Sequence, residues 1–279
     1  MEEKLTKVFF KLLLCIVVNF VAYMIANAVL PHSQGLTELN SSINPMSMMM
    51  FLLLKCTWLC FTMFFIIKNT CFGGKKLILN LILIIFFITS FTQHIDTLFI
   101  VSAFPVMTKL DIISTILSGL FSILVTAPLL VYFFQNNGNV VENIKLNLKS
   151  LVIKLGIIGI IYLILYLFFG FFVIIRIDEF KQFYSSLEVN PAMLILFQIL
   201  RGILLGIFVL PIKNMVKTKK IFIICIYFVY LCMAVDLIIP NTLLPTNLRR
   251  AHLIEMTISM IIFGTIVGNI MWGKQKTSA

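Results

Sequence analysis

The chain has 279 residues, of which 61% are hydrophobic and only 12% are charged. Soluble domains usually carry charges on about a quarter of their residues, so this composition excludes both a soluble globular domain and an intrinsically disordered chain. The net charge of +11 then indicates membrane topology and attraction to anionic lipid headgroups, not binding of nucleic acid.

Long apolar segments recur along the whole chain, and each has the roughly 20 residues that a helix needs to cross a bilayer. Eight spanning helices are predicted, at 9–30, 46–67, 77–100, 112–134, 151–175, 192–213, 221–239 and 251–272. The third segment is the least regular, because Gln93, His94 and Asp96 make its last part polar. That part is expected to end the span early or to unwind, and seven spans are the alternative. The predicted fold class is therefore an all-α polytopic helix bundle.

The distribution of lysine and arginine predicts the orientation of these helices. With eight spans, fifteen of the 22 basic residues fall in or beside the segments on the side of the two termini, and five fall on the opposite side. Basic residues concentrate on the cytoplasmic side of membrane proteins, so both termini are predicted to be cytoplasmic. The expected location is the plasma membrane, or the inner membrane if the host is a bacterium.

The longest cytoplasmic connection, 135–150, divides a single transmembrane domain that covers residues 1–279. Its apolar residues Val141, Ile144 and Leu148 recur at helical spacing, which predicts an amphipathic segment on the inner membrane surface. The two parts that it joins, 1–135 and 151–279, each contain four predicted spans.

Charged residues take comparable places in these two halves. They are Lys11 and Lys154, Lys55 and Arg201, and Asp96 and Asp236. Two explanations stay open, namely duplication of a four-span unit and chance placement. Because each half has an even number of spans, duplicated halves would be parallel and related by an axis along the membrane normal.

Polar or ionisable residues interrupt the apolar segments at nine positions, and the predicted topology places all nine toward the outer face. They are Lys55, Gln93, His94, Asp96, Gln198, Arg201, Asp236, His252 and Glu255. A charge near the bilayer centre costs about 2.5 to 3.5 kcal/mol, so each needs a partner, water or a function. Helical spacing aligns Gln93 with Asp96, Gln198 with Arg201, and His252 with Glu255. Such stripes must face other helices or water.

These stripes predict a polar ligand-binding site in the outer half of the membrane. Arg201 and Lys55, the deepest cations, are expected to hold an anionic group. Counter-charge or proton transfer is assigned to Glu255, Asp96 and Asp236. Gln198 and Gln93 are expected to orient the ligand through hydrogen bonds, and His252 completes the set. The expected ion pairs are Arg201 with Glu255 and Lys55 with Asp96.

Two GxxxG patterns suggest how the helices pack. They are Gly202 to Gly206 in the sixth segment and Gly264 to Gly268 in the eighth. A contact between these two segments is expected, and it would bring Arg201 toward Glu255.

No motif identifies the chemistry of this site. The histidines and carboxylates are acceptable zinc ligands, but HExxH spacing is missing, and no phosphate loop, dinucleotide fingerprint or nucleophile elbow occurs. No metal and no cofactor is predicted.

Three functional classes stay open. The first is binding or transport of a small solute, such as an anion, or of a lipid headgroup. The second is a membrane enzyme that acts on a lipid-like substrate with His and carboxylate groups. The third is a non-catalytic subunit with structural ion pairs. Membrane lipids are expected partners, together with a small-molecule substrate and a membrane-protein partner or a second copy, but not nucleic acid.

Overall fold

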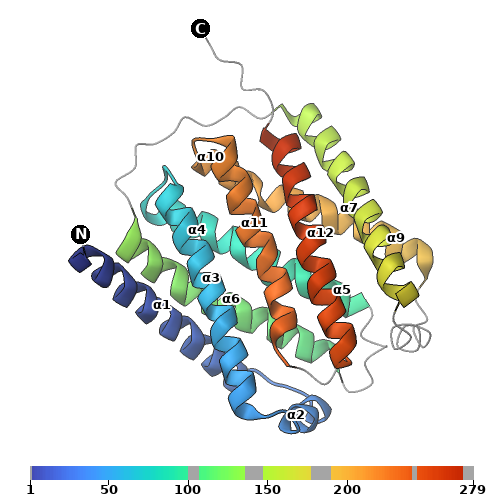
Figure 1. Ribbon diagram of the computed structural model, residues 1–279, viewed down its shortest axis with the longest axis horizontal. Helices are drawn as coiled ribbons and strands as arrows, with labels where there is room; N and C mark the ends of the chain where they lie inside the picture. The colour runs from blue at the N-terminus through green and yellow to red at the C-terminus, as the bar shows by residue number, and fades with distance from the viewer. Residues whose placement is uncertain (1, 100–106, 136–146, 177–189, 241–243, 273–279) are drawn as a thin grey trace.

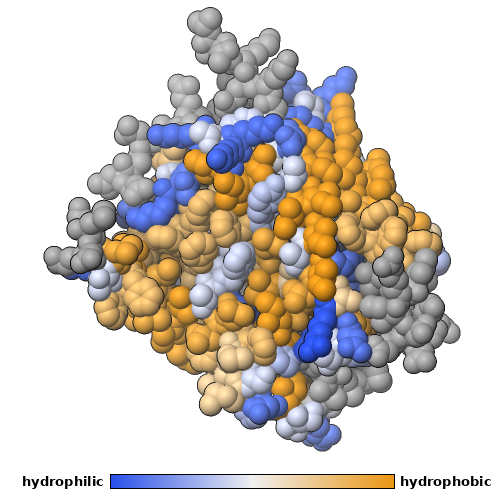
Figure 2. All heavy atoms as spheres, viewed as in Figure 1, coloured by the Kyte–Doolittle hydropathy of each residue, from blue (hydrophilic) through white to orange (hydrophobic). Residues whose placement is uncertain are grey.

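Helices account for all the regular structure in the part of the chain that the computed structural model describes. This part comprises residues 2–99, 107–135, 147–176, 190–240 and 244–272. Eight of its helical segments are long and apolar enough to span a membrane. In Figure 2, apolar side chains form a broad belt over the bundle, and hydrophilic residues gather toward its ends. The prediction of an all-α polytopic bundle with eight spans is confirmed. The segment predicted to lie on the membrane surface falls at 136–146, outside the described residues.

The spanning helices follow the predicted segments closely (Figure 1). In chain order they are α1 (Glu2–Val29), α3 (Pro45–Asn69), α4 (Gly74–Ile85) with η1 (Phe86–Phe91) and α5 (Thr92–Phe99), α6 (Lys109–Phe134), α7 (Leu148–Arg176), α9 (Pro191–Phe208) with α10 (Leu210–Met215), α11 (Lys219–Val235) with η3 (Asp236–Ile238), and α12 (Thr246–Trp272). A short helix, α2 (Gln34–Ser41), precedes α3.

The third span is irregular but does not end early. Its middle part, η1, is a π-helical turn, in which the backbone N–H of Thr92 donates to the carbonyl of Phe87. The Thr92 hydroxyl donates to the same carbonyl. The irregularity therefore lies one turn before the polar residues Gln93 to Asp96, where unwinding was expected. The alternative of seven spans is wrong, because the helix continues through Phe99.

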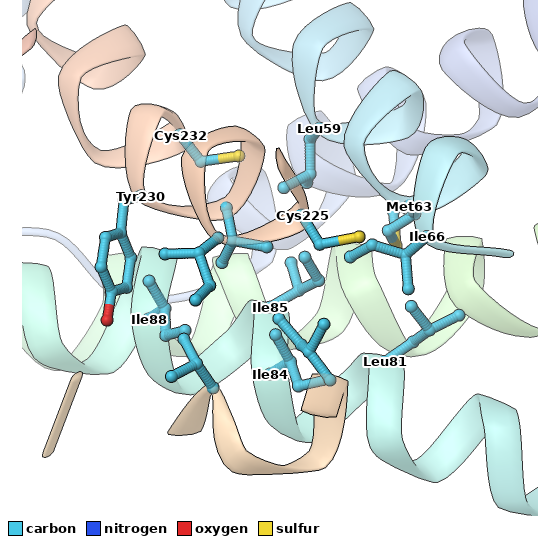
Figure 3. Close-up of a cluster of buried hydrophobic side chains, with 14 of the residues drawn as sticks. Leu59, Met63, Ile66, Leu81, Ile84, Ile85, Ile88, Cys225, Tyr230 and Cys232 are labelled. Carbon is cyan, nitrogen blue, oxygen red and sulfur yellow. The ribbon is translucent and has the colours of Figure 1, made fainter. Parts of the chain in front are cut away.

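The helices form two packed groups that meet at α11. In the first group α1 packs against α3 and α6, and α4 packs against α6. In the second, α7 packs against α9 and α12, and α12 packs against α11. Helix α11 also packs against α3 and η1, which joins the two groups. Figure 3 shows this junction, where Met63, Ile85 and Cys225 are buried side by side.

Glycines bring neighbouring helices close together, although not the pair that the sequence suggested. A Cβ atom added to Gly202 of α9 would lie 2.5 Å from Cβ of Tyr162 on α7. One added to Gly268 of α12 would lie 2.5 Å from Cγ1 of Ile223 on α11. The expectation that the two GxxxG patterns join α9 to α12 is therefore wrong. Each pattern packs its helix against a sequence neighbour.

The end of the bundle that holds the start of α1 and the end of α12 is closed by backbone contacts. Thr70, after α3, forms an isolated antiparallel bridge with Val216, after α10. The N–H of Cys71 donates to the carbonyl of Met215 at 2.7 Å, and the N–H of Gly74 donates to Oε1 of Gln135 at 2.8 Å. The bridge and the Cys71 bond tie the two groups together at this end, and the Gln135 bond joins α6 to the start of α4 within the first group.

At the opposite end, a buried carboxylate ties the loop after α1 to the start of α6. Asp111 is fully buried, and it accepts hydrogen bonds from the backbone N–H and the hydroxyl of Ser33 and from the same two groups of Thr108, all at 2.7 or 2.8 Å. Four donors around one carboxylate make this contact costly to lose.

We expect Asp111→Asn to lower the free energy of unfolding by about 3 kcal/mol. The asparagine side chain replaces one acceptor oxygen with an NH₂ group, whose two N–H donors would face groups that are themselves donors. Denaturant unfolding of the purified protein in detergent, followed by circular dichroism, measures the change. Glu38→Gln, on the exposed surface of α2, is the matched control and is expected to be neutral. Equal stability of the two variants would contradict the structural role of Asp111.

Candidate functional site

An ion pair between Lys55 and Asp236 lies at the junction of the two helix groups. Nζ of Lys55 lies 2.6 Å from Oδ1 of Asp236, and the two side chains are only 19% and 11% exposed. Lys55 follows Pro45 by ten residues, about 15 Å along α3, so it is deep in the span. Asp236 caps the end of α11. Nζ of Lys55 also lies 5.1 Å from the centre of the Tyr23 ring on α1.

A small cavity of about 20 Å³ with a mostly apolar lining lies beside this pair. Among its lining groups are Asn19 and Tyr23 of α1, Thr89 and Ser90 of η1, and Ser122 of α6. This volume holds about one water molecule but no organic solute. The structure therefore shows a small cavity at Lys55, to which three helices contribute amide and hydroxyl groups.

The π-helical turn shapes one wall of this cavity. A Cβ atom on Gly119 of α6 would overlap with the Ser90 side chain, so only glycine lets η1 approach α6 here. The extra residue in a π-turn also rotates the side chains that follow it by about 100° relative to a regular α-helix. Gln93 accordingly donates from Nε2 to the carbonyl of Met233 on α11, at 3.2 Å.

His94 is a further ionisable group of the third span. It is partly buried on α5, within electrostatic range of Asp236, Lys55 and Arg201. The sequence placed His94 among the nine intramembrane polar residues but left it out of the binding site. Ideal helical spacing from Thr89 and Gln93 points it away from their stripe, so helical spacing offered no reason to include it.

Arg201 has surroundings that resemble those of Lys55. It is 5% exposed, and its guanidinium carbon lies 5.8 Å from the centre of the Tyr162 ring on α7. One turn earlier, Gln198 is 2% exposed, and its Oε1 has no hydrogen-bond partner among the residues that the structure describes. Arg201 and Gln198 do share a face, as their spacing predicts.

The other predicted charges are arranged differently from the expectation. The carboxylate that binds Lys55 is Asp236, whereas the sequence suggested Asp96, whose side chain lies outside the described residues. Glu255 bonds to His252 on its own helix, with 2.9 Å between Oε2 and Nδ1. The predicted pairing of Lys55 with Asp96 therefore stays a prediction. Glu255 bonds to His252, where a bond to Arg201 was expected.

Sequence reasoning missed the uncharged part of the site. Tyr23, Tyr162, Asn19 and Ser122 occur in apolar segments, where tyrosine and single polar residues are common. No spacing within one helix relates them to Lys55 or Arg201, because each contact joins two helices. Their role is visible only once the helices are packed.

Comparisons with known proteins bring no further information about the site. No protein-family model matches the chain, and neither a curated protein nor a solved structure is similar enough to match it. The function must therefore be argued from the geometry of the site.

We expect Lys55→Met and Asp236→Leu each to lower the free energy of unfolding by about 3 kcal/mol, because each leaves a buried charge without its partner. The double variant is expected to lose less than the sum of the two, with a coupling energy of about 1 to 3 kcal/mol. Chemical unfolding in detergent provides all four values.

Lys68→Met, at the far end of the same helix, is the control and is expected to combine additively with Asp236→Leu. Additive losses for Lys55→Met and Asp236→Leu as well would show that the two charges do not stabilise each other.

Proposed function

We propose that this multi-pass membrane protein is a proton-coupled carrier of a small anionic solute, and that Lys55, Asp236, His94 and Arg201 form its binding site. One observation carries the proposal: the charged groups come from α3, α11, α5 and α9, where the first and second helix groups meet. Carriers commonly bind their substrates between two such groups, close to the middle of the membrane.

The Lys55 and Asp236 pair supplies a route to coupling. While Asp236 is ionised, it neutralises Lys55 and occupies the position of an incoming anion. A proton that binds an Asp236 oxygen removes this negative charge and leaves the ammonium over the Tyr23 ring, where it can bind an anion. Proton and anion then bind together.

Interrupted helices near the site support movement. The third span contains η1, and the sixth breaks after Phe208, next to Pro211, which lacks a backbone N–H. The rings of Phe87 and Phe208 stack across these two interruptions, with centroids 4.2 Å apart and planes 7° from parallel. Bending is concentrated where helical hydrogen bonds are broken, so these two helices are the natural moving parts.

We expect the site to open toward the predicted outer face. The end with the Thr70 and Val216 bridge is tied by backbone bonds, and the buried residues Met63 and Ile66 (Figure 3) lie between it and Lys55 along α3. Asp236, by contrast, lies where α11 ends at the opposite side. In the conformation described here, the shorter path from the ion pair to solvent therefore runs toward the predicted outer face.

Catalysis has one specific observation in its favour. His252 and Glu255 are 2.9 Å apart and partly buried, with 21% and 14% of their side chains exposed, which suits an acid and base pair. They lie one turn apart on α12 with no nucleophile motif in the sequence. This pair makes a lipid-modifying enzyme the second candidate.

Transport is tested with the purified full chain in liposomes that contain a pH-sensitive dye. We expect gradients of phosphate, sulfate or succinate to acidify the interior for at least one of these anions. Lys55→Gln should remove both anion uptake and proton movement. Asp236→Asn should lower proton movement at least tenfold while anion exchange persists, because Lys55 keeps its charge.

Lys68→Gln is the matched lysine control and is expected to transport like the unmodified chain. Transport by Lys55→Met with Asp236→Leu at the unmodified rate would show that the ion pair is structural. Fluxes equal to those of protein-free liposomes with all three anions would overturn the carrier proposal.

A further inference from the structure

We infer that the two halves are copies of one four-helix unit, and that the chain therefore carries a second anion-binding site, centred on Arg201, that matches the one at Lys55. The ligand class rests on the proposed function. The duplication rests on independent observations of sequence, local structure and packing.

The second spans of the two halves align over their whole length at an interval of 146 residues. Asn44-Pro45 matches Asn190-Pro191, and Lys55 matches Arg201. Identical residues also recur in the same register, at Phe51 and Phe197, Leu54 and Leu200, Leu59 and Leu205, and Ile66 and Ile212. One interval thus relates the start, the middle and the end of both helices.

The aligned residues also have the same local structure. Asn44 (φ −60°, ψ 116°) and Asn190 (φ −65°, ψ 117°) cap their helices by accepting from the next two free N–H groups. Asparagine before proline is a strong helix start, because proline has no backbone N–H group that would need an acceptor.

Small residues follow the cation in both helices and face the first helix of the same half. Gly206 of α9 approaches Leu155 of α7, and Cys60 of α3, its counterpart, lies beside Cys15 of α1 in the buried cluster. Each cation then contacts a tyrosine of that same first helix, Lys55 with Tyr23 and Arg201 with Tyr162.

Most contacts between the helices are reciprocal, although the contact of α3 with α6 has no counterpart of similar extent between α9 and α12. Helix α1 packs against α3 and α6, as α7 packs against α9 and α12, and α4 packs against α6 as α11 packs against α12. Between the halves, α3 packs against α11, and α9 packs against η1 and α5. This arrangement is that of two parallel repeats.

One contact marks the axis that relates the repeats. Thr70 and Val216 are separated by the same 146 residues, and they pair with each other in an isolated bridge. Equivalent residues of two copies meet directly only on a two-fold axis. The axis therefore passes through this bridge, and it runs along the membrane normal because each half has an even number of spans.

The two-fold relation pairs the deep cations as equivalent sites. At the first site, α3 supplies Lys55, α1 supplies Tyr23, and the third span of the other half supplies Asp236. At the second, α9 supplies Arg201, α7 supplies Tyr162, and the third span of the other half supplies His94 within electrostatic range. Gln198, with its buried Oε1, adds a hydrogen-bond acceptor for a protonated ligand group or water.

Binding stoichiometry tests this inference on the full chain. Equilibrium binding of radiolabelled phosphate, sulfate and succinate to the purified protein in nanodiscs is expected to give two sites per chain for the anion that is transported. Lys55→Gln and Arg201→Gln should each leave one site, and the double variant none. Lys55→Arg and Arg201→Lys should each keep both sites, because each places the cation of one repeat in the other.

The outcomes separate the two proposals. A single site in the unmodified chain, or two sites that survive Arg201→Gln, overturns the second site while the carrier proposal stands. No binding of any of the three anions overturns both. Lys68→Gln controls for a general loss of positive charge and should keep two sites. If Arg201→Gln does not fold, the stoichiometry of the unmodified chain decides the question.

Discussion

The ion pair between Lys55 and Asp236 is the contact on which the arrangement of the two helix groups depends. Neither charge can be left alone in a bilayer, because hydrocarbon offers no water or counter-ion. The pair satisfies both charges only when α3 and α11 lie side by side, with Nζ and Oδ1 2.6 Å apart. The position of α11 in turn brings η1 and α12 into place. One electrostatic requirement thus links the packing of the two halves.

Close packing supplies the remaining stability. Apolar side chains gain little by leaving lipid for the protein interior, so membrane helices associate through tight contact and through small residues. Gly202 and Gly268 provide such contacts within the second half, and Gly119 provides one between α6 and η1. The contact at Gly119 also positions Ser90 in the cavity wall. Helix packing and the shape of the site therefore depend on the same residues.

The proposed function follows from features of this arrangement that a purely structural ion pair does not need. An ion pair that only held helices together would be replaceable by apolar residues of similar volume, often without loss of stability. Here the pair adjoins a small cavity, two interrupted helices and a histidine that interacts electrostatically with both cations. Together these features suit a site that binds a charged ligand and then changes its shape.

The internal repetition that we infer gives the proposed function a simple structural basis. Two copies of one unit, placed around an axis along the membrane normal, bring two second spans and two third spans together at the centre of the bundle. Polar groups on these spans then accumulate at the interface between the copies, where Lys55, Arg201 and His94 lie. The differences between the copies, such as lysine in one and arginine in the other, allow the two sites to diverge.

The sequence by itself determined the membrane class, the eight spans and most of the polar residues at the centre. Each of these depends on local properties: the length of an apolar run, or the cost of a charge such as Arg201 in hydrocarbon. The helix starts at Asn44-Pro45 and Asn190-Pro191 can also be predicted from the sequence, because capping involves neighbouring residues only.

Only the tertiary structure decided the partners. Asp236 and Asp96 have the same charge and similar predicted depths, so spacing along the chain could not select the carboxylate that binds Lys55. The π-turn at Phe86–Phe91 rotated the polar residues that follow it, a change that ideal helical periodicity does not contain. The contacts of Tyr23 and Tyr162 with the two cations join separate helices, and an amino-acid sequence carries no direct record of which helix faces which.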